Sequence, residues 1–398
     1  MASNLNNMDD RDFILELAER IIPVQAISPE SGGDGESKRA DLLLKILSEM
    51  GFDGAQRYDI TDHHGVVRSS LILKEGNRDR TLWIIAHIDT VPVGNRAAWT
   101  YEPFSPTVKG DRIYGRGTSD DGQAIFLSLL LLKKLRKADL KLNLGIALVA
   151  DEEVGSKYGI QFLLEKNLFS KKDLILVPDA GTSEGTEIEI AEKSILWVKF
   201  KVSGKQYHAS QPFMAINANR EAMKFFLKLD ENLHEKFKLE NPIFSPPYST
   251  FEPTKREKNV DNVNTIPGTE VQYYDCRVLP KYDLDLVIDQ IDTTIRDFQK
   301  TSKAKITYEL FQKEQAPLPT HESAEIVTRL KEAIREVKNK EPGIVGIGGG
   351  TCAAYFRRKG YDAAVWCTTQ PEVAHQADEY VVIPDILGDL EIIEKIIY

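Results

Sequence analysis

Three apolar runs, each ending abruptly in an acidic residue, constrain the fold of this chain most strongly. Residues 81–89 (TLWIIAHID), 143–151 (NLGIALVAD) and 173–179 (DLILVPD) are continuously rich in Ile, Leu and Val. Runs of this kind are typical of parallel strands that are buried on both faces of a sheet. Helical patterns lie between them, and residues 122–140 begin with three turns that are apolar nearly all round. This alternation predicts an α/β fold with a mainly parallel sheet flanked by helices.

A different pattern occupies residues 192–313. Its strand-like runs alternate polar and apolar residues, as half-solvated antiparallel strands do, and a long amphipathic helix is predicted over residues 215–237. A chain of 398 residues is also longer than one compact core usually holds. We therefore predict a main, catalytic domain of residues 1–191 and 314–398, interrupted by a smaller α+β domain.

Composition argues against several classes of partner. The chain has 51 basic and 61 acidic residues, a net charge of −10, and no long basic cluster, so we expect no nucleic-acid partner. No apolar run approaches the roughly 20 residues that a membrane span needs, so we expect no membrane partner. Cys276, Cys352 and Cys367 are too few and too far apart for a disulfide framework or a thiolate zinc site. The polar N-terminus lacks the pattern of a signal peptide, which predicts a cytoplasmic protein.

Polar side chains collect where the predicted strands end. His87 and Asp89 are residues i and i+2 of a strand, so both point to one face, where burial without a partner is costly. Ligands gather at the carboxyl ends of strands in open α/β sheets, so polar groups that follow other strands are expected to meet this pair. These further groups are Asp120, Glu152, Glu153, Asp179 and His375.

Several carboxylates in one small volume repel one another unless cations neutralise them. Imidazole and carboxylate ligands, without thiolate, suit zinc, cobalt or manganese. The sequence therefore predicts a divalent metal site at this edge of the sheet.

Five motifs, taken in order, resemble those of one enzyme family. The segments HIDTVP, YGRGTSDDG, DEEVGS, PDA and AHQADE are similar to those of the zinc-dependent exopeptidase and deacylase family. That family includes glutamate carboxypeptidase, carnosinase-type dipeptidases, acetylornithine deacetylase and succinyl-diaminopimelate desuccinylase. The resemblance covers essentially the whole chain, and residues 192–313 fall where the family carries its lid. It implies an amide hydrolase with two divalent metal ions, most often zinc.

The ligands that the resemblance implies are two imidazoles and three carboxylates. Asp120 would bridge the two ions and would be joined to Asp121 by a cis peptide bond. The other ligands would complete one ion or the other: His87 and Asp179 the first, Glu153 and His375 the second.

Two further residues receive catalytic roles from the resemblance. Glu152 would be the general base that takes a proton from a metal-held water and returns it to the leaving amine. Asp89 would accept a hydrogen bond from the ring of His87 and fix its tautomer.

The resemblance also implies substrate contacts and a homodimer formed through the lid domain. In relatives, a histidine that corresponds to His208 reaches the partner subunit's active site and stabilises the oxyanion. An arginine fork and backbone N–H groups suit a substrate carboxylate. The residues expected to bind that carboxylate are Asn264, Arg277, Gly349, Gly350 and Thr351.

Several of these residues also have ordinary structural interpretations. His87 with Asp89 would, alone, be a satisfied buried pair, and His208 an ordinary surface residue. Asp121 is equally well explained as a helix cap or turn residue, and the GGGT segment as a tight strand-to-helix turn. The histidines that belong to no motif are expected to be solvated: His63, His64, His234 and His321.

Two departures from the desuccinylase pattern bear on the substrate. Asp179 stands where desuccinylases and acetylornithine deacetylases have Glu, and SDDGQ resembles the dipeptidase form DDKG more than the deacylase form DMKG. We therefore expect a dipeptide or an N-acyl amino acid as substrate. The alternatives are a biosynthetic deacylase of those two types, a hydrolase with one functional ion, and a catalytically inactive scaffold. The presence of all five ligands and of Glu152 argues against the scaffold.

Overall fold

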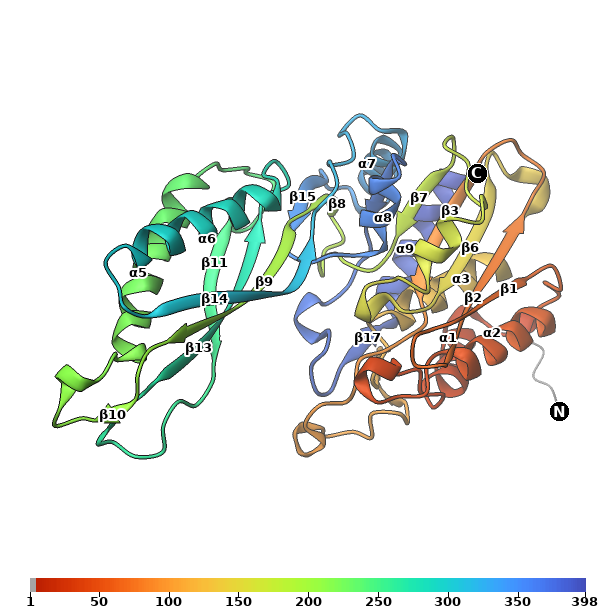
Figure 1. Ribbon diagram of the computed structural model, residues 1–398. Coiled ribbons are helices and arrows are strands. Elements are labelled where there is room, and N and C mark those ends of the chain that lie inside the picture. Colours follow the sequence, from red (N-terminus) through yellow and green to blue (C-terminus); the bar gives the residue numbers. More distant parts are fainter. Residues whose placement is uncertain (1–4) are drawn as a thin grey trace. The chain divides into compact units, whose positions relative to one another are not determined.

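The computed structural model describes residues 5–398, which form two compact units (Figure 1). The first, unit 1, comprises the chain up to Ile190 together with Thr320–Val345 and Thr351–Tyr398. The second, unit 2, comprises Ala191–Pro319 and Gly346–Gly350. The boundaries expected from the sequence are 192 and 313.

The short segment Gly346–Gly350 belongs to unit 2, although the sequence pattern assigns it to the main domain. Backbone hydrogen bonds explain the difference. The N–H of Gly346 donates to the carbonyl of Ile243 at 2.7 Å, and the N–H of Lys193 donates to the carbonyl of Ile347 at 3.0 Å. These partners are distant in sequence, so no local pattern could reveal the pairing.

Unit 1 is built on an eight-stranded sheet of order β1-β2-β6-β3-β7-β16-β8-β15. The central strands β6, β3, β7 and β16 are parallel, while β1 runs antiparallel to β2, β2 to β6, and β8 to β16. The predicted α/β class with a mainly parallel sheet is confirmed. In sheet order the strands are Gln56–Thr61, Val67–Glu75, Asn143–Val149, Thr81–His87, Leu174–Val177, Ala363–Val365, Glu187–Glu192 and Gly343–Ile347.

Burial on both faces explains the continuous apolar runs. Every residue of β3 and of β6 is buried. Trp83 and Ile85 of β3 pack in a cluster with Phe356 of α8, and the alternate residues of β3 point to the opposite face. Helix α3 is buried from Gly122 to Leu132, which accounts for its apolar character all round.

Seven α-helices belong to unit 1 among residues 5–398. They are α1 (Asp10–Ile21), α2 (Ser37–Glu49), α3 (Gly122–Lys133), α4 (Ile160–Leu164), α7 (Glu325–Lys338), α8 (Cys352–Arg358) and α9 (Ile383–Ile397). A small antiparallel sheet contains β17 (Tyr380–Val382), β5 (Arg112–Tyr114) and β4 (Thr107–Lys109). Short 3-10 helices include η2 (Pro29–Ser31), η3 (Arg96–Ala98), η4 (Lys137–Asp139), η5 (Glu152–Val154) and η7 (Pro371–Val373).

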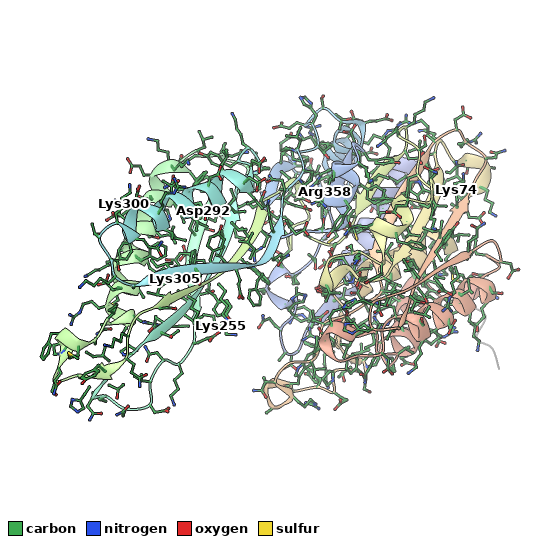
Figure 2. The ribbon with its side chains drawn as sticks, viewed as in Figure 1. Lys74, Lys255, Asp292, Lys300, Lys305 and Arg358 are labelled. Atoms are coloured by element: carbon green, nitrogen blue, oxygen red, sulfur yellow. The ribbon has the colours of Figure 1, made fainter. Side chains whose placement is uncertain are left out.

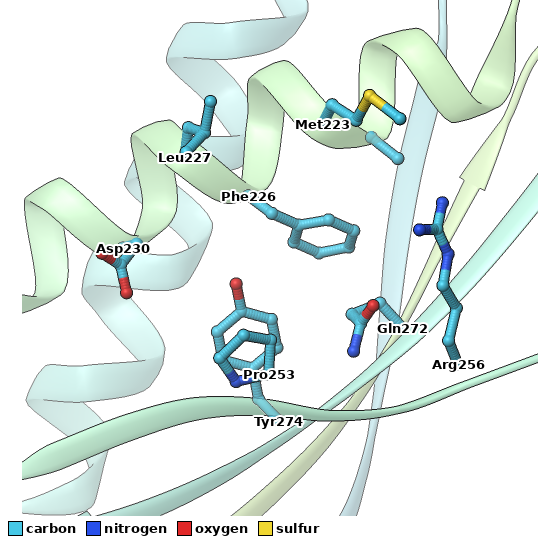
Figure 3. Close-up of a pocket in the computed structure, with 9 residues that line it drawn as sticks. Met223, Phe226, Leu227, Asp230, Pro253, Arg256, Gln272 and Tyr274 are labelled. Atoms are coloured by element: carbon cyan, nitrogen blue, oxygen red, sulfur yellow. The ribbon is translucent and has the colours of Figure 1, made fainter.

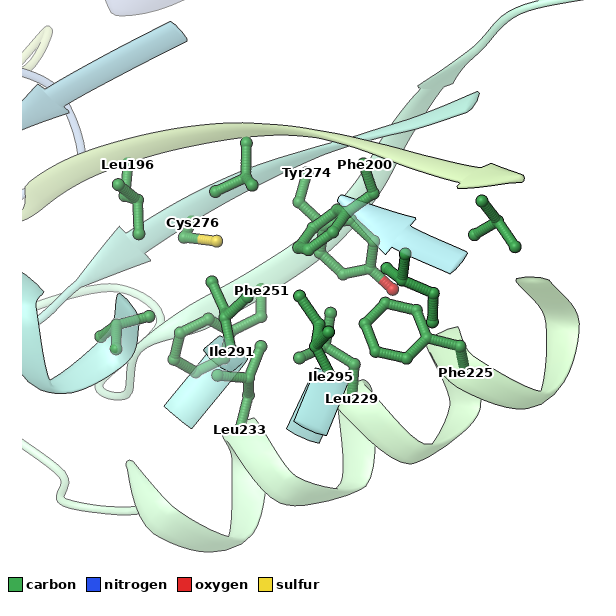
Figure 4. Packing of buried hydrophobic residues seen from close by; sticks show 14 of the residues in the cluster. Leu196, Phe200, Phe225, Leu229, Leu233, Phe251, Tyr274, Cys276, Ile291 and Ile295 are labelled. Atoms are coloured by element: carbon green, nitrogen blue, oxygen red, sulfur yellow. The ribbon is translucent and has the colours of Figure 1, made fainter. Parts of the chain in front are cut away.

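Unit 2 is a four-stranded antiparallel sheet of order β11-β13-β9-β14 with two helices. Along β9, Leu196, Val198 and Phe200 are buried and alternate with more exposed residues, as the sequence predicts. The buried residues pack against α5 and α6 (Figure 4). The elements are β9 (Ser194–Ser203), β10 (Tyr207–His208), α5 (Ala218–Lys236), β11 (Thr250–Arg256), β12 (Thr265–Ile266), β13 (Thr269–Val278), α6 (Leu284–Gln299) and β14 (Lys305–Glu314).

Many charged side chains lie on the outside of each unit. Figure 2 labels Lys74 and Arg358 of unit 1 and Lys255, Lys300 and Lys305 of unit 2, and all five are exposed. Within residues 5–398, no helix has both the length and the apolar character that crossing a membrane requires.

Truncating the central aromatic residue of unit 2 is expected to destabilise that unit. Phe200 is fully buried, and its ring lies 5.8 Å from that of Phe225 and 5.5 Å from that of Tyr274, centroid to centroid. Phe200→Ala should lower the free energy of unfolding by about 3–5 kcal/mol, measured by hydrogen exchange of β9 and β13 amides. Phe311→Ala, at a side chain that is 61% exposed, is the control and should change it by less than about 0.5 kcal/mol. Equal effects of the two substitutions would contradict this packing.

Candidate metal centre

The parallel pairing of three strands brings polar side chains to one edge of the unit 1 sheet. His87 is the last residue of β3 and lies opposite Val149, the last residue of β6. The chain after β6 enters η5 with Glu152 and Glu153, and the chain after β7 reaches Asp179. Register therefore places these side chains together although they are far apart in sequence.

Asp120 lies between two imidazoles. Its Oδ1 is 2.8 Å from Nε2 of His87, and its Oδ2 is 2.9 Å from Nε2 of His375. The same nitrogen of His375 is 3.1 Å from Oε2 of Glu153, and Nε2 of His87 is 3.7 Å from Oδ1 of Asp179. The structure thus brings together all five side chains that the sequence analysis proposes as ligands.

Within this cluster, two groups of three residues offer ligand atoms that all lie within 4.8 Å of one another. The first group is His87, Asp120 and Glu153, and all three belong to the predicted set. The second group is His87, Asp121 and Asp179. Both groups combine one imidazole with two carboxylates, a donor set that suits a divalent transition metal.

Asp121 has a larger part in this cluster than the sequence analysis assigns to it. It is the N-cap residue of α3, but its side chain makes no capping hydrogen bond, so that interpretation of the side chain is wrong. Instead, Oδ2 accepts the backbone N–H of His87 at 3.1 Å, and Oδ1 is buried without a hydrogen-bond partner in the described chain. Burial, followed by the charge of Asp179, raises the pKa of Asp121 well above its usual value. The peptide bond between Asp120 and Asp121 is cis, as the resemblance implies.

Asp89 explains why a buried strand can end in two polar residues. Its carboxylate is fully buried, and Nδ1 of His87 lies 3.1 Å from the backbone carbonyl of Asp89 and 3.3 Å from Oδ1. The same oxygen accepts the backbone N–H of Glu152 at 3.0 Å, while Oδ2 accepts the N–H of Glu153 at 3.1 Å. Asp89 thus contacts the imidazole through its backbone carbonyl and its carboxylate, and the carboxylate also holds the loop that carries both glutamates.

Glu379 performs a similar task for the turn that leads to Asp120, and sequence reasoning missed it. Its carboxylate is fully buried and accepts the backbone N–H groups of Gly117, Ser119 and Asp120 at 2.9–3.1 Å. Arg116 neutralises it at 2.6 Å. The available signal was the acidic end of the AHQADE motif, four residues after His375.

The carboxylates of the cluster other than Asp120 bind protons more tightly than usual. Burial, followed by the charge of Asp179, raises the pKa of Glu152 well above its usual value. Burial also raises the pKa of Asp179 to about 7 and raises that of Glu153. These groups are expensive to keep ionised unless a cation is present.

The imidazoles compensate part of this charge. Hydrogen bonds with Asp120 and Glu153 raise the pKa of His375 to about 10. Burial lowers the pKa of His87, but hydrogen bonds to Asp120 and Asp89 outweigh it, so the pKa lies well above its usual value. Burial likewise opposes ionisation of Asp120, but His375 and His87 hold its pKa well below the usual range.

Two predicted substrate contacts, His208 and Asn264, are exposed residues of unit 2. His208 lies on β10, exposed, with its Nδ1 2.7 Å from the hydroxyl of Ser210. Asn264 is also exposed, and its side-chain oxygen accepts the amide of Asn262 at 2.5 Å.

The other predicted substrate contacts lie at Arg277 and the GGGT segment. The guanidinium of Arg277 donates twice to Asp275, at 2.7 and 3.0 Å, and once to the carbonyl of Gly348 at 2.9 Å. Gly349 and Gly350 are exposed. Thr351, in unit 1, is the N-cap residue of α8, where its hydroxyl accepts the N–H of Ala353 at 3.1 Å.

Comparison with known proteins agrees with this geometry. Residues 83–398 match Peptidase family M20/M25/M40. An uncharacterized metallohydrolase of Methanocaldococcus jannaschii is 41% identical over 98% of this chain and 100% of that protein. A succinyl-diaminopimelate desuccinylase of Orientia tsutsugamushi is 26% identical over 95% of this chain and 94% of that protein. The crystal structure of an M20 family metallo-carboxypeptidase from Sulfolobus solfataricus has the same fold, with a TM-score of 0.74 at 19% identity over 98% of each chain.

The resemblance drawn from the five motifs is therefore confirmed. The family match includes the strand that ends in His87 and every later part of the cluster. This chain belongs to peptidase family M20/M25/M40 and is a metal-dependent hydrolase.

Proposed function

We propose that the chain is a two-metal amide hydrolase that cleaves a dipeptide or an N-acyl amino acid. The observation that carries this proposal is the carboxylate of Asp120, whose two oxygens lie 2.8 and 2.9 Å from two different imidazoles. A carboxylate in that position is suited to bridging two cations. We assign His87 and Asp179 to one ion and Glu153 and His375 to the other.

The donor set fits divalent cations. The pKa of Glu152 is raised well above its usual value by burial and the charge of Asp179, and that of Asp179 is raised to about 7 by burial. Asp121 has a buried oxygen without a hydrogen-bond partner in residues 5–398. Cations at this place would stabilise the ionised forms of Glu152 and Asp179 and would give the Asp121 oxygen a partner. The absence of thiolate ligands favours zinc, cobalt or manganese.

Glu152 is the residue we assign to proton transfer. Its backbone N–H donates to Asp89, which fixes the backbone of Glu152 next to Glu153. When bound, the metal ions would lower the pKa of a water molecule and polarise the amide carbonyl. Glu152 would accept the proton of that water and return it to the leaving amine. A carboxyl group can perform both tasks because it can accept and return a proton.

We assign recognition of a substrate carboxylate to Arg277 with Asn264 and the GGGT segment. The two hydrogen bonds that the Arg277 guanidinium donates to Asp275 fix its plane, so its fork is preorganised. A Cβ added at Gly349 or Gly350 would meet no atom within 4 Å, so the backbone there is open to a ligand. The hydroxyl of Thr351 caps α8, so we assign its role to the backbone N–H.

The alternative substrate class is that of the biosynthetic deacylases. The Orientia tsutsugamushi relative is named a succinyl-diaminopimelate desuccinylase, which supports this alternative. Asp179 and the SDDGQ turn favour a peptide or an N-acyl amino acid instead.

We also propose a homodimer that forms through unit 2. Helix α5 exposes Met223 and Leu227, with exposed fractions of 54% and 69%, beside a groove of about 550 Å³ (Figure 3). The groove is lined from the other side by β11 and β13, and β11 is an edge strand of its sheet. Exposed apolar residues beside an unpaired edge strand are a typical association surface. In such a dimer, His208 would serve the partner subunit's active site.

The substrate proposal is tested by comparing the hydrolysis of two classes of amide. Zinc- or cobalt-loaded protein is assayed on a set of dipeptides, on N-succinyl-diaminopimelate and on N-acetylornithine. We expect kcat/KM to be highest for dipeptides. A preference for the acylated diamino acids would support the alternative, and no hydrolysis by metal-loaded protein would contradict the proposed function.

The blank for this assay is Glu152→Ala. It should lower kcat by at least about 10²–10⁴-fold, with metal content unchanged, because the proton acceptor is lost. Glu165→Ala, at an exposed glutamate that follows α4, is the matched control and should keep the parental rate. A near-parental rate for Glu152→Ala would show that the assignment of the base is wrong.

Metal ions should stabilise the fold more at pH 8 than at pH 6. In the metal-free protein, the stability that Asp179 contributes by binding a proton is present below about pH 4 and is lost as the pH rises through about 7. The corresponding contribution of His375 is present below about pH 6.5 and is lost as the pH rises through about 10. A metal ion must displace these protons before it can bind. At pH 6 a ligand with a pKa of about 7 is mostly protonated, which weakens metal binding about tenfold.

The measurement is the melting temperature of chelator-dialysed protein, with and without zinc, at both pH values. We expect a larger zinc-induced increase at pH 8. An equal or larger increase at pH 6 would contradict the assignment of Asp179 and His375 as ligands.

The dimer proposal predicts that a single substitution that introduces a charge on α5 dissociates the dimer. Light scattering of the parent should give twice the mass of the chain, and Leu227→Asp should give a single chain mass. Leu286→Asp, at a 46% exposed residue on α6, is the matched control and should remain dimeric. A monomeric parent, or a Leu227→Asp variant that stays dimeric, would contradict the proposed interface.

A further inference from the structure

We propose that Glu30, His63 and His64 form a binding site for an additional divalent transition-metal ion. One ligand atom from each residue lies within 4.8 Å of the other two. None of the three belongs to the cluster around Asp120, and no family motif in the sequence includes them. Two imidazoles and one carboxylate, with open solvent for further ligands, suit zinc or a similar ion rather than magnesium.

A tight turn between β1 and β2 presents both imidazoles. The carboxylate of Asp62 accepts the backbone N–H groups of His64 and Val66, each at 2.9 Å, and so fixes the turn. The rings of His63 and His64 lie side by side, with centroids 3.9 Å apart and planes inclined by 41°. A fixed backbone reduces the conformational entropy that two ligands lose when they bind one ion.

Glu30, from η2, supplies the third ligand. Its Oε1 is 3.9 Å from Nδ1 of His63 and 4.0 Å from Nε2 of His64. These distances exceed those of hydrogen bonds, so direct bonds to the imidazoles do not explain the arrangement. Ligand atoms around tetrahedral zinc lie about 3.4 Å apart, given bonds of about 2.0–2.1 Å, so small side-chain rotations are enough to close the site.

The carboxylate of Glu30 is held so that one oxygen remains directed at the histidines. The hydroxyl of Ser28 donates to the other oxygen, Oε2, and Nη1 of Arg68 lies 3.5 Å from that same atom. The carboxylate therefore keeps its charge and its orientation, and Oε1 is the oxygen that faces the imidazoles.

Two contacts connect this site to the loop that carries Glu152. The hydroxyl of Tyr158 is 3.1 Å from Nδ1 of His63, and the backbone N–H of Tyr158 donates to Asp151 at 2.8 Å. Arg68, which is fully buried, lies 3.0 Å from the carboxylate of Asp151. A cation bound by Glu30 and His63 would thus lie next to contacts of Tyr158 and Arg68. These are the two residues that contact the carboxylate of Asp151, the residue before Glu152.

Zinc titration of the zinc-loaded holoenzyme tests the proposal. After removal of loosely bound metal, calorimetry should show one further equivalent of zinc for the parent and none for the His63→Ala/His64→Ala variant. The single variant His64→Ala should bind this equivalent at least about tenfold more weakly. Magnesium should give no corresponding binding, because it prefers an octahedron of oxygen ligands.

The matched control is His234→Ala/His321→Ala, which removes two exposed histidines outside the cluster. It should retain the additional equivalent. Unchanged melting temperatures, and the same loss with His63→Gln/His64→Gln, exclude misfolding as the cause. The proposal is overturned if the parent binds no further zinc, if the double variant titrates like the parent, or if the control loses the site as well.

Discussion

The burial of several carboxylates at one edge of a parallel sheet is the constraint on which the rest of the site depends. The register of β3 against β6 and β7 delivers His87, Asp179 and the η5 glutamates to the same place, because parallel strands end together. Ionised carboxylates in a buried volume are unfavourable without cations, as the pKa of Asp179 of about 7 illustrates. The fold thus creates an electrostatic cost that metal ions are suited to remove.

The loops that carry these ligands are held by other carboxylates. Asp89 accepts two backbone N–H groups of η5, and Glu379 accepts three from the turn before Asp120. Both carboxylates are fully buried. Because hydrogen bonds to the protein itself fix the loops, the ligand geometry is largely preorganised, which lowers the ordering cost of metal binding. Two polar residues at the end of a buried strand are therefore explained without strain in β3.

Much of the fold and the protein family could be predicted from the sequence, because local sequence patterns indicate them. Continuous apolar runs predicted the two-face-buried strands, alternation predicted the antiparallel sheet of unit 2, and five motifs predicted the family. What could not be predicted depends on contacts between distant segments. The examples are the pairing of Gly346–Gly350 with unit 2, the buried oxygen of Asp121, and the meeting of Glu30 with His63 and His64.

The central claim is that Asp120 bridges two metal ions. Anomalous diffraction from crystals of the zinc-loaded protein, collected on both sides of the zinc edge, tests it most directly. We expect two peaks about 3.5–4 Å apart, one beside each oxygen of Asp120, with His87 at one peak and His375 at the other. A single peak, or two peaks of which only one contacts Asp120, would contradict the account.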